Sequence, residues 1–396
     1  MDSPIGRAVQ DCIKRTRWDE LRRYASRLHS SDIDNDNDIV SCTLGPSITN
    51  GLHHLVPTLE FADGAQWVAR IQLAPSTPEL AAKMQVEVDT MSLLRERTEV
   101  PIPKVFGYEV DTDNPVGVAF MLTEFLPGMV AMEADGGFAV HRAQIPAERR
   151  PGFYSAVAEI QVQITSVRLP KIGTVVKLAD GSYGIGPLPV LGGPFETATA
   201  FFEAWAEHTK FPHSTDIIQE VLSSHPPEYT SAVLASLRDF PAQIKVLASR
   251  IPGSDAGPFP VMHPDFFHSN IMVDSSYNIL GVIDWEGAST VPWELVEFPL
   301  FLDAVPISMD RVPSNYDADG NPVDEGTKQR WKERKKYVEM VEGFERARNR
   351  DTQLSSALKN RTYQGLSYGM RVYREPGKLT PLYSRVLEPF RVGNKE

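Results

Sequence analysis

HPDFFHSN at residues 263–270 and IDWEG at residues 283–287 together decide how this chain is built. The first segment separates Asp265 from Asn270 by four residues, and the second places Asp284 directly after an apolar stretch. Mg²⁺ is a hard ion that prefers oxygen ligands, which an amide oxygen of Asn270 and a carboxylate of Asp284 supply. A carboxylate at Asp265 can accept the proton of a hydroxyl group and orient its oxygen. Phosphoryl transfer to a hydroxyl group needs this combination of groups.

Two short strands are predicted between these segments. Residues 271–273 and 279–283 are apolar, and the polar residues between them are typical of a turn. This hairpin folds the chain back, so Asp284 is expected to return beside Asn270. An aspartate in a loop is usually a cap or a turn residue when it stands alone. The spacing from Asn270 and Asp284 favours a functional role for Asp265 instead.

These segments resemble the aminoglycoside phosphotransferase family, a branch of the protein-kinase-like fold. Members carry a His-x-Asp loop, an Asn five residues after the Asp, and an Ile-Asp-(Phe/Trp) segment after a hairpin. His263 and Asp265 match the first feature, and Asn270 matches the second. The form Ile-Asp-Trp-Glu at residues 283–286 is most similar to fungal members. The resemblance implies that Asp265 is the catalytic base and that Asn270 and Asp284 bind Mg²⁺. We expect His263 to be a buried, hydrogen-bonded residue that orients the loop, and a role as the base is the alternative.

The resemblance extends to a β-rich region nearer the N-terminus. Arg70, in a strand predicted at residues 66–73, takes the place where kinases carry a phosphate-contacting lysine. Arginine keeps its charge and can contact phosphate and carboxylate groups through two N–H groups at once. Glu87, on the helix that follows, takes the place of the glutamate that pairs with this cation. Because side chains alternate along a strand, Arg70 shares a face with Val68 and is predicted to point inward. An ordinary surface ion pair is the alternative.

Two further segments are candidates for contacts with ATP. Residues 121–128, with the sequence MLTEFLPG, resemble the adenine-binding hinge of kinases. The resemblance implies that backbone groups at Glu124 and Leu126 contact the adenine.

Residues 44–51 lack the G-x-G-x-x-G pattern of a phosphate-covering loop. They are either such a loop, with Ser47 and backbone N–H groups near the phosphates, or a simple turn.

The predicted fold class is α+β. We expect a bilobal protein-kinase-like fold with a small β-rich N-lobe that contains one helix, and a larger, mostly helical C-lobe. The expected domains are an N-terminal helical extension at 1–38, a nucleotide-binding N-lobe at 39–126, and a C-lobe with the catalytic loop and the substrate site at 127–396. Apolar residues at helical spacing predict C-lobe helices around residues 153–164, 234–247 and 331–344. Ligands commonly lie between such lobes.

The composition limits the class of protein. Of the 396 residues, 42% are hydrophobic and 23% are charged, which is ordinary for a globular protein. The formal net charge of −12 disfavours general binding to the phosphates of nucleic acids. No apolar run reaches the ~18 residues of a membrane span, and the N-terminus shows no signal or transit peptide pattern. Cys12 and Cys42 are too few for a disulfide framework. We therefore expect a cytoplasmic protein without nucleic-acid or membrane partners.

The sequence thus predicts an ATP- and Mg²⁺-dependent phosphotransferase that acts on a hydroxyl group of a small molecule. One alternative is a catalytically inactive kinase-like protein that binds a nucleotide or a partner, and another is a protein kinase.

The acidic residues within 303–325 are either a solvated loop or a rim for an amine-bearing substrate. The basic run at residues 328–336 is predicted to be the exposed face of a helix. His268 receives no role.

Overall fold

The structure is a computed structural model that describes residues 3–32, 40–142 and 144–391, without the side chain of Ser47. The chain divides into two compact units. Unit 1 consists of Met1–Glu96, Val100–Ala134 and Asn270–Gly287. Unit 2 consists of Arg97–Glu99, Asp135–Ser269 and Ala288–Glu396.

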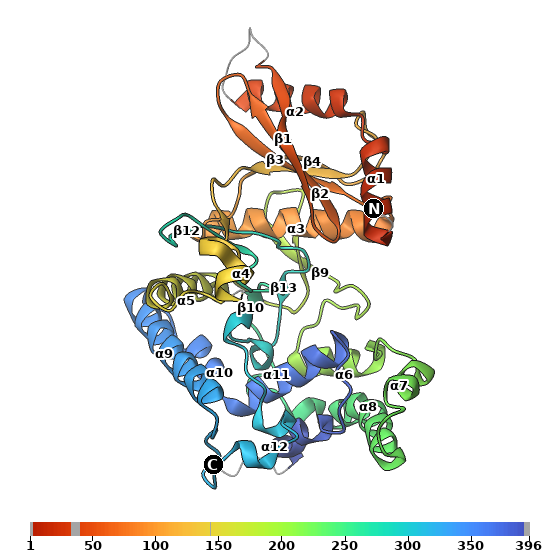
Figure 1. Cartoon of the computed structure of the whole chain (residues 1–396), viewed down its shortest axis with the longest axis vertical. Coiled ribbons are helices and arrows are strands. Elements are labelled where there is room, and N and C mark those ends of the chain that lie inside the picture. Colours follow the sequence, from red (N-terminus) through yellow and green to blue (C-terminus); the bar gives the residue numbers. More distant parts are fainter. Residues whose placement is uncertain (1–2, 33–39, 143, 392–396) are drawn as a thin grey trace. The chain divides into compact units, whose positions relative to one another are not determined.

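Unit 1 is built around a five-stranded antiparallel sheet with the strand order β1-β2-β3-β5-β4 (Figure 1). Its strands are β1 Cys42–Asn50, β2 His54–Phe61, β3 Gln66–Gln72, β4 Val105–Glu109 and β5 Phe120–Glu124. The helices of this unit are α1 Pro4–Arg15, α2 Trp18–Asp32 and α3 Pro78–Arg97. The β-rich region with one following helix is therefore confirmed. α3 ends before Pro101 and Pro103, since proline disfavours helical geometry in the residue before it.

The two faces of this sheet have different partners. Along β3, Trp67, Ala69 and Ile71 are buried and pack against apolar residues of α1 and α2. The N-terminal helices, expected as an extension at residues 1–38, thus contribute to the core of unit 1. Arg70 lies on the opposite face of β3, where its side chain meets α3. The alternation of side chains along the strand separates the apolar core from a polar face.

A smaller sheet of unit 1 carries the predicted hairpin. β11 Ile271–Val273 pairs with β12 Ile279–Val282, which confirms the hairpin. β11 also pairs with β6 Met129–Val130, a strand that was not predicted. This pairing explains why Asn270–Gly287 groups with unit 1, although the expected N-lobe ended at residue 126.

Unit 2 is mostly helical, as predicted. Its α-helices are α4 Gly137–His141, α5 Arg150–Ser166, α6 Ala198–His208, α7 Thr215–Val221, α8 Pro227–Leu247, α9 Glu325–Ala347, α10 Gln353–Lys359, α11 Arg361–Arg374 and α12 Glu388–Arg391. The short 3-10 helices of the described chain are η1 Ala134–Gly136, η2 Ala248–Arg250, η3 Trp293–Leu295, η4 Leu300–Leu302, η5 Ile307–Met309, η6 Pro313–Asn315 and η7 Tyr383–Leu387. The three predicted C-lobe helices are confirmed as parts of α5, α8 and α9. Apolar helix faces meet in a core that includes Phe202, Phe240 and Tyr383.

Unit 2 also contains strands that were not predicted. β10 Phe259–Met262 pairs with β7 Arg168–Leu169 and β13 Ser289–Thr290, and β8 Thr174–Lys177 pairs with β9 Tyr183–Gly186. The sequence analysis predicted only the two strands of the hairpin in this half of the chain, and these further strands add to it. Each of these strands has two to four residues, too few for alternation to be visible in the sequence. β10 matters for function because it leads directly into the segment at 263–270.

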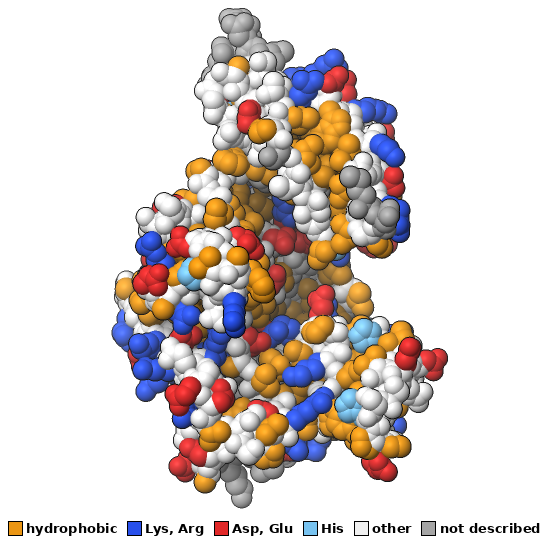
Figure 2. Space-filling model, viewed as in Figure 1, with side chains coloured by type: hydrophobic (Ala, Val, Ile, Leu, Met, Phe, Trp, Pro, Cys, Tyr) orange, Lys and Arg blue, Asp and Glu red, His pale blue; other side chains and the backbone are white. Residues whose placement is uncertain are grey.

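The surface agrees in part with the expected pattern of charge. Figure 2 shows Lys and Arg side chains gathered over the part of unit 2 where α9 runs. Lys332, Lys335 and Lys336 are exposed as predicted, but Arg330 and Arg334 are half-buried. None of the described helices combines the length and the apolar character needed to cross a membrane.

Candidate active site

Arg70 and Glu87 form a buried ion pair within unit 1. Arg70 extends from β3 and Glu87 from α3, and 2.5 Å separates Nη1 of Arg70 from Oε1 of Glu87. Only 18% of the Arg70 side chain and 3% of the Glu87 side chain are exposed. The predicted pairing and inward direction are therefore confirmed, and the alternative of a surface pair was wrong.

Electrostatics keep Arg70 charged. Burial alone would lower the pKa of Arg70, but the carboxylates of Glu87 and Asp284 outweigh this effect and raise that pKa. Burial raises the pKa of Glu87, and the Arg70 guanidinium opposes the shift. Burial, followed by the charge of Arg70, lowers the pKa of His54 to about 3, so this imidazole is neutral at pH 7. His54 was not predicted here, although its position opposite Gln72 in the β2–β3 ladder could have placed it on the Arg70 face.

Asp284 lies where the chain leaves β12 and turns. Its backbone has a φ of +63°, a left-handed conformation that costs free energy in a residue other than glycine. The next residue, Trp285, is fully buried, and its indole N–H donates to the carbonyl oxygen of Val282 at 2.9 Å. The turn presents a carboxylate that is 49% exposed, with Oδ1 of Asp284 3.2 Å from Nη2 of Arg70. The exposed carboxylate of Asp284 thus stands between a fixed tryptophan in the chain and the guanidinium group of Arg70.

Asn270 lies directly before β11 and is buried. Its backbone carbonyl accepts the N–H of Ile283 at 2.9 Å, and Ile283 immediately precedes Asp284. The hairpin therefore brings the two predicted metal ligands back together, as expected from the sequence. The side chains offer an amide oxygen and a carboxylate, which fit an ion that takes its other ligands from phosphates and water. No group of three His, Cys, Asp or Glu residues within the described part of the chain could hold a metal ion by itself.

The predicted hinge begins in β5 and packs against this hairpin. The N–H of Glu124 donates to the carbonyl oxygen of Lys104 at 2.9 Å, and the carbonyl of Leu126 accepts the N–H of Gly128 at 2.8 Å. A Cβ atom at Gly128 would stand 2.3 Å from the carbonyl oxygen of Val273. Glycine is therefore required for this close approach to β11, which ties the hinge segment to the elements that carry Asn270 and Asp284.

Ser47 lies within β1, which continues to Asn50 and pairs with β2. The register of this pairing is irregular between Leu44 and Ile48. Residues 44–51 are therefore mainly strand and not a simple turn. The side chain of Ser47 lies outside the described part of the structure, and its contact with phosphate stays a prediction.

The loop after β10 carries Asp265, in unit 2. Asp265 is exposed, and its backbone N–H donates to Nδ1 of His263 at 3.1 Å. The N–H of Phe267 donates to the carbonyl oxygen of Asp265 at 2.8 Å, which closes a tight turn. His263 is buried, as expected for a residue that orients the loop. The role of Asp265 as the catalytic base and the role of His263 in orienting the loop stay predictions.

A cavity of about 740 Å³ lies beside this loop within unit 2. Its lining includes Phe267 and His268 from the loop, Arg150 from α5, and Asp303 from the acidic segment. The buried ring of His268 lies 4.2 Å from the ring of Phe267 and 5.7 Å from that of Phe301, measured between centroids. His268 thus forms part of a cavity wall. Sequence reasoning missed this cavity because its lining comes from segments far apart in the chain.

The acidic residues within 303–325 have structural partners. Asp324 caps the N-terminus of α9, Asp303 forms an ion pair with Arg371 at 2.7 Å, and Asp310 accepts hydrogen bonds from a neighbouring asparagine. The same three aspartates also line the cavity of 740 Å³. The segment is therefore more than a solvated loop, while its recognition of an amine stays a prediction.

The chain is similar to a protein family and to several known proteins. A model of the phosphotransferase enzyme family matches residues 50–293. A subtelomeric hrmA-associated cluster protein of Aspergillus fumigatus is 23% identical over 307 residues, which cover 62% of this chain and 57% of that protein. Altered inheritance of mitochondria protein 9 of Candida tropicalis is 30% identical over 139 residues, which cover 33% of this chain and 21% of that protein. The chain thus spans little more than half the length of the first relative.

A solved structure agrees with the fold. A structure from Ralstonia eutropha, described as a candidate aminoglycoside phosphotransferase, aligns with a TM-score of 0.50 at 16% identity, covering 93% of this chain and 99% of that one. At this level of identity the likeness concerns the fold alone. It confirms the predicted α+β, kinase-like fold class.

Proposed function

The chain belongs to the phosphotransferase enzyme family, as its motifs predicted, and on this premise we propose that it transfers a phosphoryl group from ATP to a hydroxyl group of a small molecule. The observation that carries the proposal is the position of Arg70, which contacts Glu87 and Asp284 at the same time. A complex of Mg²⁺ and a nucleotide needs a fixed cation and oxygen ligands. Arg70 next to the exposed carboxylate of Asp284, with the amide of Asn270 directly before β11, suits such a complex.

In this proposal Arg70 contacts the α- and β-phosphates of ATP. A guanidinium group has five N–H donors in one plane, so it can keep Glu87 on one edge and bind phosphate oxygens on another. Backbone groups at Glu124 and Leu126 would contact the adenine. Because the N–H of Glu124 is already used by Lys104, a contact from Glu124 would come from its carbonyl oxygen.

Asn270 and Asp284 would hold Mg²⁺ through side-chain oxygens. Held by these two residues, Mg²⁺ would supply positive charge that offsets the negative charge of the phosphate groups. The left-handed backbone at Asp284 supports this assignment, because it presents an exposed carboxylate beside Arg70. Ser47 is the candidate for a further phosphate contact from β1.

Asp265 would act on the acceptor. Its carboxylate takes the proton of the acceptor hydroxyl while that oxygen bonds to the γ-phosphorus of ATP. The bond between the γ-phosphorus and the bridging oxygen breaks, and ADP leaves. His263 would position Asp265 through the backbone hydrogen bond to the loop. The exposure of Asp265 supports the role, since a base must be accessible to its substrate.

The cavity beside Phe267 and His268 would receive the acceptor. Its volume of about 740 Å³ is in the range of small-molecule sites, roughly 300–1,000 Å³. The walls combine aromatic rings with the guanidinium of Arg150 and the carboxylate of Asp303. This mixture suits a polar acceptor, such as an amino alcohol or a sugar, better than an apolar alcohol.

A coupled assay of ADP release tests the proposal. Candidate amino alcohols, sugars and aminoglycosides are first selected by thermal shift, because a ligand that binds the folded chain raises its melting temperature. We expect ADP release with at least one stabilising compound, and none in the Asp265→Asn variant, which should still be stabilised by Mg·ATP. Binding of Mg·ATP without turnover of any stabilising compound would favour the inactive alternative. Turnover of a protein substrate alone would favour a protein kinase.

A further inference from the structure

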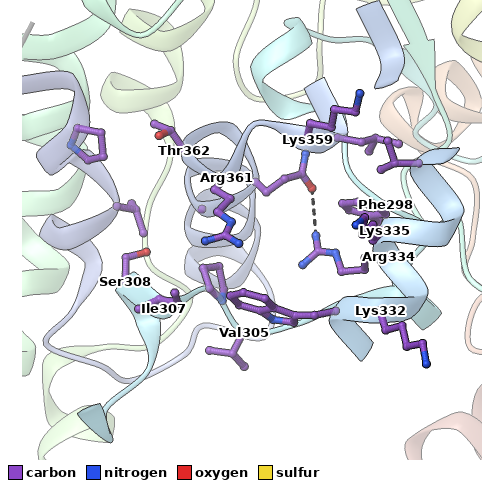
Figure 3. Close-up of a pocket in the computed structure, with 18 of the residues that line it drawn as sticks. Phe298, Val305, Ile307, Ser308, Lys332, Arg334, Lys335, Lys359, Arg361 and Thr362 are labelled. Atoms are coloured by element: carbon purple, nitrogen blue, oxygen red, sulfur yellow. Dashed lines mark hydrogen bonds between the residues drawn. The ribbon is translucent and has the colours of Figure 1, made fainter. Parts of the chain in front are cut away.

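A second cavity in unit 2 lies next to the one proposed for the acceptor, and among the described residues only Val305 lines both. It encloses about 880 Å³ and is lined by residues of α9, α10, α11, η5, η7 and α12 (Figure 3). Among the described residues that line it, none belongs to the predicted catalytic or nucleotide-binding set. A cavity of this size commonly holds a small molecule.

The lining of this cavity is strongly basic. Its cationic residues are Lys332, Arg334, Lys335, Lys359, Arg361 and Arg385. The carboxylates in the same lining are Glu339 and Glu342, and Glu342 is already paired with Lys359. The whole chain has a net charge of −12, so the excess of cations is a local property of this site.

The guanidinium groups of Arg334 and Arg361 face the cavity. In Figure 3 the side chains of Arg334 from α9 and Arg361 from α11 point into the space between the helices, whereas Lys332 points away. Within the described structure, neither arginine has a carboxylate at ion-pair distance. Arg334 donates from Nη2 to Oε1 of Gln364 at 3.3 Å, which is a neutral acceptor.

The charge on Arg334 is only partly compensated. Burial lowers the pKa of Arg334 to about 10, and the more distant carboxylates of Asp303 and Glu297 oppose this shift. Both of these carboxylates form ion pairs with Arg371. Arg334 is therefore still protonated at neutral pH, in surroundings where an additional anion would be stabilised.

Aromatic rings lie next to both guanidinium groups. The Cζ atom of Arg334 is 4.0 Å from the ring centroid of Phe298, and that of Arg361 is 4.7 Å from the ring centroid of Trp331. Cation–π contacts of this kind restrict the planes of the guanidinium groups. Because the N–H donors lie in those planes, the rings help to hold the donors in place for a ligand.

We propose that this cavity binds a small organic anion that consists of a flat apolar body and one carboxylate, sulfonate or phosphate group. Arg334 and Arg361 bind the anionic group, since each can donate two parallel N–H groups to such an oxyanion. The apolar body packs against Trp331 and the exposed side chains of Val305 and Ile307. This inference is independent of the proposed phosphoryl transfer.

The lining of the cavity favours a ligand that has both the anionic group and the flat apolar body. An inorganic anion would use the cations but leave the apolar walls of Val305 and Ile307 in water. A neutral aromatic compound would cover those walls but leave the charges of Arg334 and Arg361 uncompensated. Only a compound with both features buries apolar area and neutralises charge in one cavity.

A pair of fluorescent probes tests the chemistry of the site. 8-Anilinonaphthalene-1-sulfonate carries a flat body and an anion, and N-phenyl-1-naphthylamine is the same body without the charge. Each is titrated into the full chain in the presence of excess Mg·ATP. We expect one sulfonate probe to bind per chain, about tenfold or more tightly than the neutral probe, because charge-assisted hydrogen bonds are strong. Inorganic phosphate alone should bind more weakly than the sulfonate probe.

Substitutions on the two facing helices locate the site. Arg361→Gln should weaken binding of the sulfonate probe by about tenfold and leave binding of the neutral probe unchanged. Arg334→Gln should weaken it at least as much. Lys336→Gln is the matched control, because Lys336 is an exposed cation of α9 outside the cavity lining. If the Arg334→Gln variant does not fold, the Arg361→Gln variant alone tests the site. Arg361 is exposed, so its substitution should leave the fold intact.

Three results would overturn the inference. Equal affinity for the two probes would show an apolar site without anion recognition. Full affinity for the sulfonate probe in Arg361→Gln would place that probe elsewhere on the chain. A dimer that Arg361→Gln dissociates, observed by sedimentation velocity without a probe, would assign this surface to a second copy of the chain.

Discussion

Arg70 and Asp284 are 214 residues apart in the sequence, yet Nη2 of Arg70 donates to Oδ1 of Asp284 at 3.2 Å. The same guanidinium group contacts Glu87 at 2.5 Å, so one cation joins β3, α3 and the turn after β12. Glu87 is buried, whereas the Asp284 side chain is 49% exposed. Of the two contacts of Arg70, the one with Asp284 is therefore easier for a ligand to replace. Exposed ion pairs contribute only about 0–1 kcal/mol to the free energy of unfolding.

Replacement of Arg70 should affect both nucleotide binding and stability. Arg70→Ala should raise KM for ATP strongly, and it leaves Glu87 buried without its partner, a change that costs about 3–5 kcal/mol in comparable buried pairs. Arg70→Lys should retain part of the activity, because a cation remains but the bidentate contact is lost. Steady-state kinetics with ATP as the varied substrate, and urea unfolding, measure the two effects. Gln66→Ala, at an exposed position of the same strand, should change neither.

Glu87→Ala should resemble Arg70→Ala in raising KM for ATP, because Glu87 determines where the guanidinium points. The double variant should be less than additive in its effect on KM, since the two residues act as one unit. Independent and additive changes in KM would contradict the paired role.

Substitutions of the two aspartates of the proposed site should have different effects on nucleotide binding and on turnover. Asp284→Ala should weaken binding of Mg·ATP, because it removes an oxygen ligand of the metal. Asp265→Asn should leave that binding intact and abolish turnover, because an amide cannot accept the hydroxyl proton. Calorimetry with Mg·ATP and the ADP-release assay distinguish the two effects. A near-normal kcat in Asp265→Asn would show that another group is the base.

Trp285 should support Asp284 through packing. Trp285→Ala should lower the free energy of unfolding by about 3–5 kcal/mol, as expected for loss of a large buried side chain. It should also weaken Mg·ATP binding at a temperature where the variant is folded, because the turn at Asp284 loses its anchor. Trp285→Phe, which loses the hydrogen bond to Val282 but retains most of the apolar contact, should be intermediate. Wild-type affinity for Mg·ATP in folded Trp285→Ala would contradict the anchoring role.

A pH-dependent contribution to stability is expected at Asp351. Two N–H groups of Arg168 donate to its carboxylate and lower the pKa of Asp351 below the ordinary 3.8. A lowered pKa means that the stabilisation is present above pH 3.8 and is lost as the pH falls through the folded-state pKa. The Asp351 side chain is 48% exposed, so the contribution should be about 1 kcal/mol or less. The difference in urea midpoint between wild type and Asp351→Asn should shrink in acid, and a constant difference would contradict the assignment.

The contact between Arg70 and Glu87 was predicted from the resemblance to the aminoglycoside phosphotransferase family. The local sequence added only the inward direction of Arg70, because alternation along the strand placed it on the face of Val68. The hairpin between Asn270 and Asp284 was visible in the local sequence, because two apolar stretches flank a polar turn. These features depend on residues close together in the sequence.

The features that the sequence did not predict depend on distant contacts. Asp284 has a left-handed backbone and the next residue, Trp285, is fully buried, and no local pattern indicates either feature. The expected exposure of residues 328–336 failed for Arg334, because Gln364 and the ring of Phe298 pack against it. The two cavities of unit 2 likewise arise from the packing of helices that are far apart in the chain.

The most direct test of the account is calorimetric titration of the chain with ATP in the presence and absence of Mg²⁺. We predict one nucleotide per chain, binding that depends on Mg²⁺, and a loss of about tenfold or more in affinity in Asp284→Ala, because a charged metal ligand is removed. Lys336→Gln, which removes an exposed charge of α9, should bind as wild type does. Absence of heat with ATP, or binding that is indifferent to Mg²⁺ and to Asp284, would contradict the proposed phosphoryl transfer.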